Sequence, residues 1–331
     1  KGGNKLKQTI MFTHSDLDGV GCGILHKAAF GEDAETHYLT YYNVDEVIVT
    51  RIKEIEKNGS YHPTVIISDL GIKPETAAVV ERYRGQKVLL DHHKTNLWLQ
   101  EEYSWATIDV DASGTLLVYH YLEDKISSDY LDFALHVDDY DRWIHALPKS
   151  RQLNRLLAIL GIERFEKRML MNPKVEFNTT EQLLLKIEQE RIQDAADKVE
   201  KGITVYMLPD AKRIGIGFAD QYQSEIANDL IERLNLDAIA LIDVNYKKIS
   251  FRSKPDFDVS AIAHGLGGGG HKNASGVEFN YRYVEDFHGS KYPLIDVYHD
   301  LQNIKFDLFM AFEKVYKKNG NLDRFLERVT D

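Results

Sequence analysis

The amino-acid sequence predicts an α/β protein of two α/β domains, the first with a largely parallel sheet and flanking helices. Strand-like apolar runs alternate with segments of helical periodicity, which is typical of parallel sheets. Three apolar runs in the first half end in acidic or histidine residues, and a polar helical stretch then divides the chain. We therefore predict a first domain over residues 1–180, a linker helix over 181–202, and a smaller α/β domain with a helical tail over 203–331.

Composition narrows the classes of function. The chain of 331 residues is long enough for two domains of roughly 100–200 residues each. Its net charge of −11 argues against tight binding of long duplex nucleic acid, which usually needs a basic face. No apolar run approaches the roughly 20 residues of a membrane-spanning helix. The single cysteine, Cys22, cannot form an internal disulfide and fits a reducing, cytoplasmic location.

Polar residues follow the strand-like runs of the first domain, which cover residues 8–13, 64–67 and 87–90. In an open parallel sheet, ligands bind beyond the carboxyl ends of the strands. The segments after the three runs should therefore converge on one crevice. The side chains at these ends are His14, Asp16, Asp18, Asp69, Asp91, His92 and His93.

The residue types at these ends favour divalent cations. His14, Asp16 and Asp18 alternate, so an extended segment would turn all three to one side. Carboxylates and imidazoles suit ions such as Mn²⁺, and the candidates exceed the needs of one ion. Two ions about 3.5–4 Å apart could share a carboxylate, activate a water and stabilise a phosphoryl group. A lone aspartate after a strand more often caps a turn, but separate caps do not explain the whole set.

A glycine-rich loop marks the second domain. Four glycines at 267–270 precede His271, and their backbone N–H groups can approach an anion closely. Arg252, at the end of a strand-like run, could hold a phosphate through two hydrogen bonds. A tight turn without function and a solvated surface arginine are the alternatives. Tyr222 and Tyr246 could stack a base, although ordinary packing explains most tyrosines.

Four motifs resemble those of the DHH phosphoesterase superfamily, in the branch whose DHH-associated C-terminal domain carries a GGGH loop. They are residues 14–19 (HSDLDG), Asp69, residues 91–93 (DHH) and residues 268–271 (GGGH). The likeness spans roughly residues 8–280. Within the branch, the sequence most resembles the oligoribonucleases, or nanoRNases, which degrade very short RNA.

The resemblance implies roles for the matching residues. One metal ion would be held by His14, Asp16 and Asp69, and a second by Asp18, Asp69, His92 and Asp139. Asp139 is chosen over Asp138 and Asp141 because Asp-Tyr-Asp-Arg-Trp looks like the shared core of the fourth motif.

Further roles follow from the same resemblance. His93 would contact the scissile phosphate, and Asp91 would support the histidines by orienting them. The end of the substrate would be bound by Arg252, Gly269, Gly270 and His271.

The resulting hypothesis is a metal-dependent phosphodiesterase or exonuclease that hydrolyses very short RNA or DNA oligonucleotides to nucleoside monophosphates. Two divalent cations would serve as cofactors, with Mn²⁺ expected first and Mg²⁺ or Co²⁺ as alternatives. The expected partners are short single strands or small phosphorylated nucleotides, and neither membranes nor long duplexes. The alternative functions are a phosphatase for 3′-phosphoadenosine 5′-phosphate, a phosphodiesterase for cyclic or linear dinucleotides, and an inactive nucleotide-binding regulator.

Overall fold

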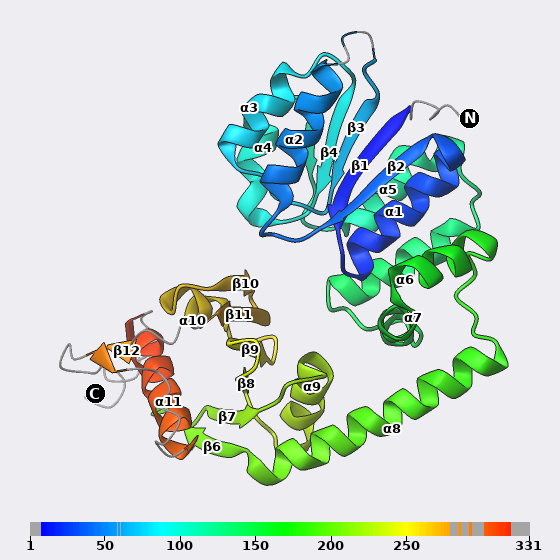
Figure 1. Cartoon of the computed structure of the whole chain (residues 1–331). Coiled ribbons are helices and arrows are strands. Elements are labelled where there is room, and N and C mark those ends of the chain that lie inside the picture. The colour runs from blue at the N-terminus through cyan, green and yellow to red at the C-terminus, as the bar shows by residue number, and fades with distance from the viewer. Residues whose placement is uncertain are drawn as a thin grey trace. The chain divides into compact units, whose positions relative to one another are not determined.

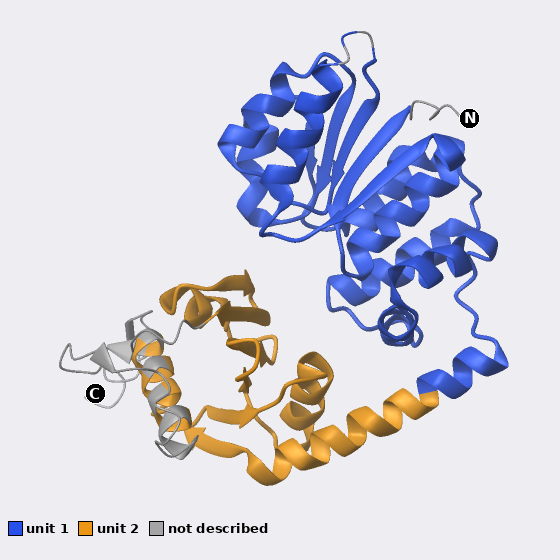
Figure 2. Ribbon diagram, viewed as in Figure 1, with its two compact units in different colours: residues 1–185 blue, residues 186–331 orange. Residues whose placement is uncertain are grey.

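The structure, a computed structural model, describes residues 8–57, 59, 61–278, 284–285, 291–292 and 301–318. The chain forms two compact units, residues 1–185 and 186–331, shown in separate colours in Figure 2. The division lies within helix α8 (Thr179–Gly202), which covers the residues expected to form the linker helix. Among the described residues, no helix combines the length and the apolar character needed to cross a membrane.

Unit 1 is built on the parallel strands β1 (Thr9–His14), β2 (Ala34–Leu39), β3 (Thr64–Ser68), β4 (Lys87–Asp91) and β5 (Ala106–Ile108). Their order in the sheet is β2-β1-β3-β4-β5 (Figure 1). β1, β3 and β4 contain the runs that the sequence predicts. The sequence does not predict β2, because this edge strand is half-buried along most of its length and lacks a continuous apolar run.

Helices cover both faces of this sheet. One group comprises α2 (Val44–Lys57), α3 (Pro74–Arg82) and α4 (Leu97–Glu102). The other comprises α1 (Leu17–Phe30), α5 (Gly114–Leu122), α6 (Tyr130–Asp141) and α7 (Ser150–Met171), with α7 interrupted at Gly161. Short 3-10 turns occupy Gly31–Asp33, Lys94–Asn96 and Glu123–Lys125.

Alternation along β1 explains the two layers of helices. Successive residues of a strand point to opposite faces of the sheet. Ile10 and Phe12 join the hydrophobic cluster of the α2 group, whereas Met11 joins the cluster of the α1 group. Both faces of the sheet are therefore buried, as expected for parallel strands joined by helices.

The strand order places a crevice at one edge of the sheet. β2 adds on one side of β1, and the later strands add on the other, so the order reverses between β1 and β3. Such a reversal leaves a ligand crevice beyond the carboxyl ends of the strands. The register aligns these ends, with Thr13 opposite Ser68 and Ser68 opposite Leu90. Residues that follow β1, β3 and β4 thus reach the same edge.

Unit 2 contains a six-stranded sheet with the order β10-β11-β9-β8-β7-β6. Only β7 and β8 are parallel within this sheet, and helix α9 (Gln223–Arg233) connects them. Its strands are β6 (Thr204–Met207), β7 (Arg213–Phe218), β8 (Ala238–Asp243), β9 (Lys248–Ser253), β10 (Gly269–His271) and β11 (Ala274–Glu278).

The two faces of this sheet pack against different helices. α8 and α9 contribute to one hydrophobic cluster, and α10 (Ser260–Gly265) and α11 (Leu301–Lys318) contribute to the other. A separate pair of strands, β12 (Val284–Glu285) and β13 (Lys291–Tyr292), precedes α11. The two α/β units confirm the predicted fold class. The tail that the sequence predicts as helical includes α11, and residues 319–331 lie outside the described residues.

Candidate metal centre

The carboxyl ends of β1, β3 and β4 bring carboxylates and imidazoles together. Among the residues that the structure describes, the donor atoms fall into three groups, each with its atoms within 4.8 Å of one another. Two groups share Asp69 and two share His92, so the groups form one connected centre. The groups are His14, Asp16 and Asp69; Asp18, His92 and Asp141; and Asp69, Asp91, His92 and His93.

The turn from β1 into α1 positions the first two of these side chains. The backbone N–H of Gly19 donates to Asp16 Oδ1 at 3.0 Å, so Asp16 caps the helix. His14 Nδ1 lies 2.9 Å from Asp16 Oδ2. A Cβ on Gly19 would lie 2.1 Å from the carbonyl oxygen of His14, and only glycine fits this turn. The turn thus holds His14 and Asp16 side by side at the end of β1.

Asp18 is held by the N-terminus of a second helix, α5. The backbone N–H groups of Gly114 and Thr115 donate to its two carboxylate oxygens at 2.7 and 2.8 Å. The Thr115 hydroxyl donates to the backbone oxygen of Asp18 at 2.6 Å. The positive end of a helix stabilises a carboxylate. Asp18 is therefore buried in a fixed orientation, with Oδ2 at 3.7 Å from His92 Nε2.

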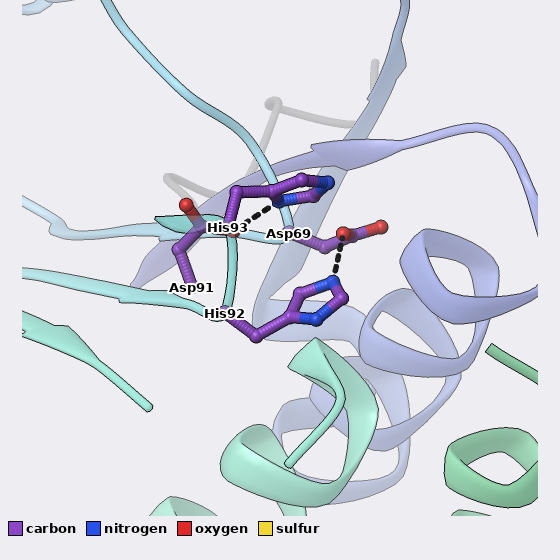
Figure 3. A group of neighbouring side chains, drawn as sticks. All are labelled: Asp69, Asp91, His92 and His93. Carbon is purple, nitrogen blue, oxygen red and sulfur yellow. Dashed lines mark hydrogen bonds and ion pairs between the residues drawn. The ribbon is translucent and has the colours of Figure 1, made fainter. Parts of the chain in front are cut away.

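Asp69 lies between the other groups of the centre. It follows β3 with a φ of 51°, a conformation uncommon for residues other than glycine. Its Oδ1 lies 3.4 Å from His92 Nε2, and its Oδ2 is buried without a hydrogen-bond partner. Figure 3 shows the His92 ring turned toward Asp69. A buried carboxylate oxygen without a donor is costly unless a cation neutralises it.

Asp91 and His93 form a separate hydrogen-bonded pair within the centre (Figure 3). His93 Nδ1 lies 2.8 Å from Asp91 Oδ1, and Asn96 Nδ2 donates to Asp91 Oδ2 at 2.5 Å. Burial alone would raise the pKa of Asp91, but the hydrogen bond and charge of His93 and the bond from Asn96 lower it overall. Burial opposes protonation of His93, yet Asp91 outweighs it and raises the pKa of His93. The pair therefore favours a charged carboxylate beside a protonated imidazole.

The three aspartates of the fourth motif lie in different surroundings, and the buried Oδ2 atoms of both Asp139 and Asp141 have no hydrogen-bond partner. Asp139 Oδ1 accepts from the backbone N–H groups of Ala146 and Leu147 at 2.7 and 3.2 Å, which ties it to the loop after α6. Asp138 Oδ1 accepts from the N–H of Ser113 at 2.7 Å. Asp141 Oδ2 instead lies 3.4 Å from His92 Nε2. The geometry therefore favours Asp141 over Asp139 as the residue that completes the centre.

The electrostatics of the centre fit bound cations. Burial, followed by the charges of neighbouring carboxylates, raises the pKa of Asp69 and of Asp141 well above the usual range. Burial also raises the pKa of Asp18, although His92 opposes the shift. Crowded carboxylates repel one another when no positive charge lies between them. The donor set and the unpaired oxygens of Asp69 and Asp141 thus fit divalent cations.

Tyr41 also reaches the centre, although it belongs to none of the motifs in the sequence. Its ring centroid lies 4.6 Å from that of His14, with the planes inclined by 34°. The burial of its hydroxyl among protein atoms and the charges of Asp69 and Asp16 raise the pKa of Tyr41. Its place in the chain could have indicated this position, since Tyr41 follows β2, whose carboxyl end lies beside that of β1.

In unit 2, the substrate-binding candidates share one row of the sheet. Arg252 on β9 and His271 on β10 both lie opposite Ala274 of β11, so their side chains point to the same face. The Arg252 Nη2 donates to Ser224 Oγ at 2.7 Å, which orients the guanidinium. Gly270 has a φ of 133°, where a side chain would be strained.

The glycine-rich loop packs closely against the neighbouring strand. A Cβ on Gly268 would lie 2.2 Å from the carbonyl oxygen of Gly276. A Cβ on Gly269 would meet only His264, at 3.6 Å, which is ordinary contact. Gly268 is therefore required by packing, and so is Gly270, whose Cβ would lie 2.6 Å from Ser275 Cα. Gly269, Gly270 and His271 lie on β10 and form the part of the loop that remains a substrate-binding candidate.

Other polar residues of unit 2 serve mainly in packing. Asn273 Nδ2 donates to Ser253 Oγ and to the carbonyls of Lys254 and Phe257. The Tyr222 hydroxyl donates to Glu188 Oε1 at 2.7 Å.

Polar residues near the two motif regions lie in both buried and exposed positions. Ser275 is buried and donates to the carbonyl of Val259. Ser113 caps α5 by accepting from the N–H of Leu116. Lys272 and Tyr246 are exposed.

Comparison with known proteins identifies the family. A model of the DHHA1 domain matches residues 200–288. The oligoribonuclease NrnB of Bacillus subtilis (strain 168) is 32% identical over 333 residues, which cover 94% of this chain and 80% of that protein. A 3′,5′-cyclic-nucleotide phosphodiesterase of Helicobacter pylori is 23% identical, over 85% of this chain and 97% of that protein.

A solved structure shares the fold. RecJ from Thermus thermophilus, in complex with Mn²⁺, matches with a TM-score of 0.52 and 14% identity. The match covers 83% of this chain and 50% of RecJ. With the extensive identity to the oligoribonuclease, these findings show that the chain belongs to the DHH phosphoesterase superfamily, in the branch that carries a DHHA1 domain.

Proposed function

We propose that the protein is a metal-dependent phosphodiesterase that hydrolyses very short RNA or DNA oligonucleotides to nucleoside monophosphates. The connected donor groups that share Asp69 and His92 are the observation that carries this proposal. The 32% identity to an oligoribonuclease favours short RNA as the substrate. Family membership supports a phosphoesterase of nucleic acid, and the substrate length and the metal are the parts proposed here.

The donor groups would hold two divalent cations, and we propose Mn²⁺ in the first place, as in the RecJ structure, with Mg²⁺ or Co²⁺ as alternatives. One cation would be held by His14, Asp16 and Asp69, and the other by Asp18, Asp69, His92 and Asp141. When bound, such a pair supplies an activated water and stabilises charge on the attacking and leaving oxygens of the phosphate.

His93 would act on the substrate rather than on a cation. Its Nδ1 is hydrogen-bonded to Asp91, and a protonated imidazole has a second donor, Nε2, which would bind a phosphate oxygen. The raised pKa of His93 keeps the imidazole protonated over a wider pH range, so that it can stabilise negative charge as the phosphate is attacked. Asp91 would position His93 without touching the substrate.

Unit 2 would bind the end of the substrate. Arg252 and His271 point to one face of the sheet, and Gly269 beside them leaves open the space that a side chain would fill. Recognition of a terminal group would favour substrates of a few nucleotides over long strands. A cytoplasmic location is part of the proposal, and it is supported by the free, buried thiol of Cys22.

The test is hydrolysis of labelled RNA from dinucleotide to 24-mer, with Mn²⁺ and with chelator, by the wild type and by Asp69→Asn. We expect metal-dependent loss of the shortest species first and little activity in the variant. An exposed acidic residue in unit 1, Asp124, supplies the matched control, Asp124→Asn. Equal degradation of all lengths, or full activity in chelator, would contradict the proposal.

Small nucleotides belong in the same panel as rival substrates. The similarity to a 3′,5′-cyclic-nucleotide phosphodiesterase is the reason to include cyclic nucleotides, beside cyclic and linear dinucleotides and 3′-phosphoadenosine 5′-phosphate. If one of these small nucleotides is cleaved while the oligonucleotides stay intact, the proposed substrate is wrong. The proposed metal centre would still stand. An inactive nucleotide-binding regulator is disfavoured because the donor set of the centre is complete.

A further inference from the structure

Tyr41 lies on the rim of the centre because of the strand register. β2 pairs in parallel with β1, and Leu39 at the end of β2 lies opposite His14 at the end of β1. Tyr41 comes two residues after Leu39, in the segment that leads into α2. The chain therefore carries an aromatic side chain past the same edge of the sheet at which the metal-binding side chains converge.

The ring of Tyr41 contacts His14, and much of the side chain is exposed to solvent. It contacts the imidazole of His14 at 4.6 Å between centroids. The residue nevertheless remains 59% exposed, whereas Tyr119 and Tyr130 of the same unit are packed into the core. An aromatic side chain that remains this exposed beside a polar centre contributes little to the core. Its exposed ring face is available to a planar ligand.

The charges of the centre indicate which part of a nucleotide the Tyr41 ring could bind. The side chains grouped with His14, which the Tyr41 ring contacts, are the carboxylates of Asp16 and Asp69. Carboxylates repel a phosphate that lacks a cation between them, so the rim offers an anion little attraction of its own. Stacking on an aromatic ring needs no charge, and every nucleobase has a face to offer.

We propose that Tyr41 forms a nucleobase-binding subsite of the centre, in which its exposed ring face stacks on the base of a nucleotide next to the scissile phosphate. This inference rests on the proposed function, since it concerns a nucleotide substrate at the same centre. The hydroxyl plays no part in stacking, so phenylalanine should replace tyrosine, whereas leucine should not. Tyr41 thereby favours substrates with a base at this position over phosphodiesters without one.

The test compares Tyr41→Leu and Tyr41→Phe with the wild type, on a dinucleotide and on the same dinucleotide with either base removed in turn. Tyr121, which is 46% exposed near the other end of α5, supplies the control Tyr121→Leu. We expect Tyr41→Leu to raise KM for the intact dinucleotide about tenfold, a typical loss for one stacked base. Tyr41→Phe should restore the wild-type KM. Removal of the stacked base should raise KM in the wild type and abolish the difference between wild type and Tyr41→Leu.

The following outcomes would contradict a base-binding role of Tyr41. An unchanged KM in Tyr41→Leu, or an equal rise for every abasic substrate, would overturn it. A defect of equal size in Tyr41→Phe would assign the role to the hydroxyl, and loss of Mn²⁺ from Tyr41→Leu would assign it to support of His14. If the wild type cleaves none of the dinucleotides, the proposed function fails. If it cleaves them without regard to the base, only this inference fails.

Discussion

Asp141 Oδ2 lies 3.4 Å from His92 Nε2, at the end of α6, and this approach completes the group that also contains Asp18. The neighbouring Asp139 accepts two backbone N–H groups from the loop that follows. Two carboxylates of one short motif thus have different tasks. One faces the centre, and the other holds the chain that leaves it.

Replacing these two carboxylates separates their tasks. Asp141→Asn should lower turnover and Mn²⁺ affinity by more than about 100-fold, beyond the range typical of residues that only support a ligand. Asp139→Asn keeps an oxygen for the N–H groups of Ala146 and Leu147 and should retain most activity. Steady-state kinetics with titrated Mn²⁺ measures both. The reverse ranking would restore Asp139 as the ligand.

Gly114 leaves no room for a side chain beside the two central aspartates. A Cβ there would lie 2.8 Å from Asp69 Cβ and 2.9 Å from Asp18 Oδ2. Gly114→Ala should push these carboxylates apart and lower Mn²⁺ affinity about tenfold or more. Gly202→Ala is the control, because a Cβ on Gly202 meets nothing within 4 Å. Mn²⁺ binding as tight in Gly114→Ala as in Gly202→Ala would count against this packing argument.

His26 makes unit 1 sensitive to acid. It is fully buried between Thr9 and Thr36, to whose hydroxyls its nitrogens are hydrogen-bonded at 2.8 and 2.9 Å. Burial, with a smaller effect of Lys27, lowers the pKa of His26 to about 3. The unfolded chain therefore binds a proton that the folded chain excludes. Stability should fall as pH drops from about 6.5 toward 3.

Urea unfolding at several pH values, with chelator present, tests this dependence. All three tryptophans, Trp98, Trp105 and Trp143, belong to unit 1, so their fluorescence reports that unit. His26→Gln should be less stable than the wild type at pH 7 and should lose less stability between pH 7 and pH 4. A loss of stability between pH 7 and pH 4 that is as large in His26→Gln as in the wild type would contradict the assignment.

Arg252 should affect binding of substrate more than its turnover. The chemistry is assigned to side chains of unit 1, whereas Arg252 belongs to unit 2. Arg252→Lys keeps the charge but loses the planar fork that can hold a phosphate with two bonds. We expect KM to rise about tenfold while kcat and Mn²⁺ content change little. A loss confined to kcat would remove Arg252 from substrate binding.

The strand-end part of the centre could be predicted from the sequence for a physical reason. Parallel strands deliver their following residues to one edge, so His14, Asp69 and His92 had to converge once the strands were located. Tyr41 could not be found this way, because it follows β2, an edge strand without a continuous apolar run. A missed strand hides the residues that follow it.

The choice within the fourth motif depends on how α6 is rotated. Successive helical residues turn by about 100°, so Asp139 and Asp141 point to nearly opposite sides. The apolar stripe of Phe133, Ala134 and Val137 continues at helical spacing to Asp138 and to Asp141 alike, so the sequence pattern does not choose between them. Similarity of a short motif does not tell how the helix is rotated. This rotation is set by packing of α6 against α1, α5 and α7.

Asp69 belongs to two of the three donor groups, and counting bound Mn²⁺ tests whether it joins two cation sites in one centre. Metal-free wild type, Asp69→Asn and Asp124→Asn would be dialysed to equilibrium against Mn²⁺, and the metal content would be measured per chain. We predict two ions in the wild type and in Asp124→Asn, and fewer than two in Asp69→Asn, because both sites lose a shared oxygen. A wild type that binds one ion or none, or an Asp69→Asn variant that retains two with undiminished affinity, would contradict the account.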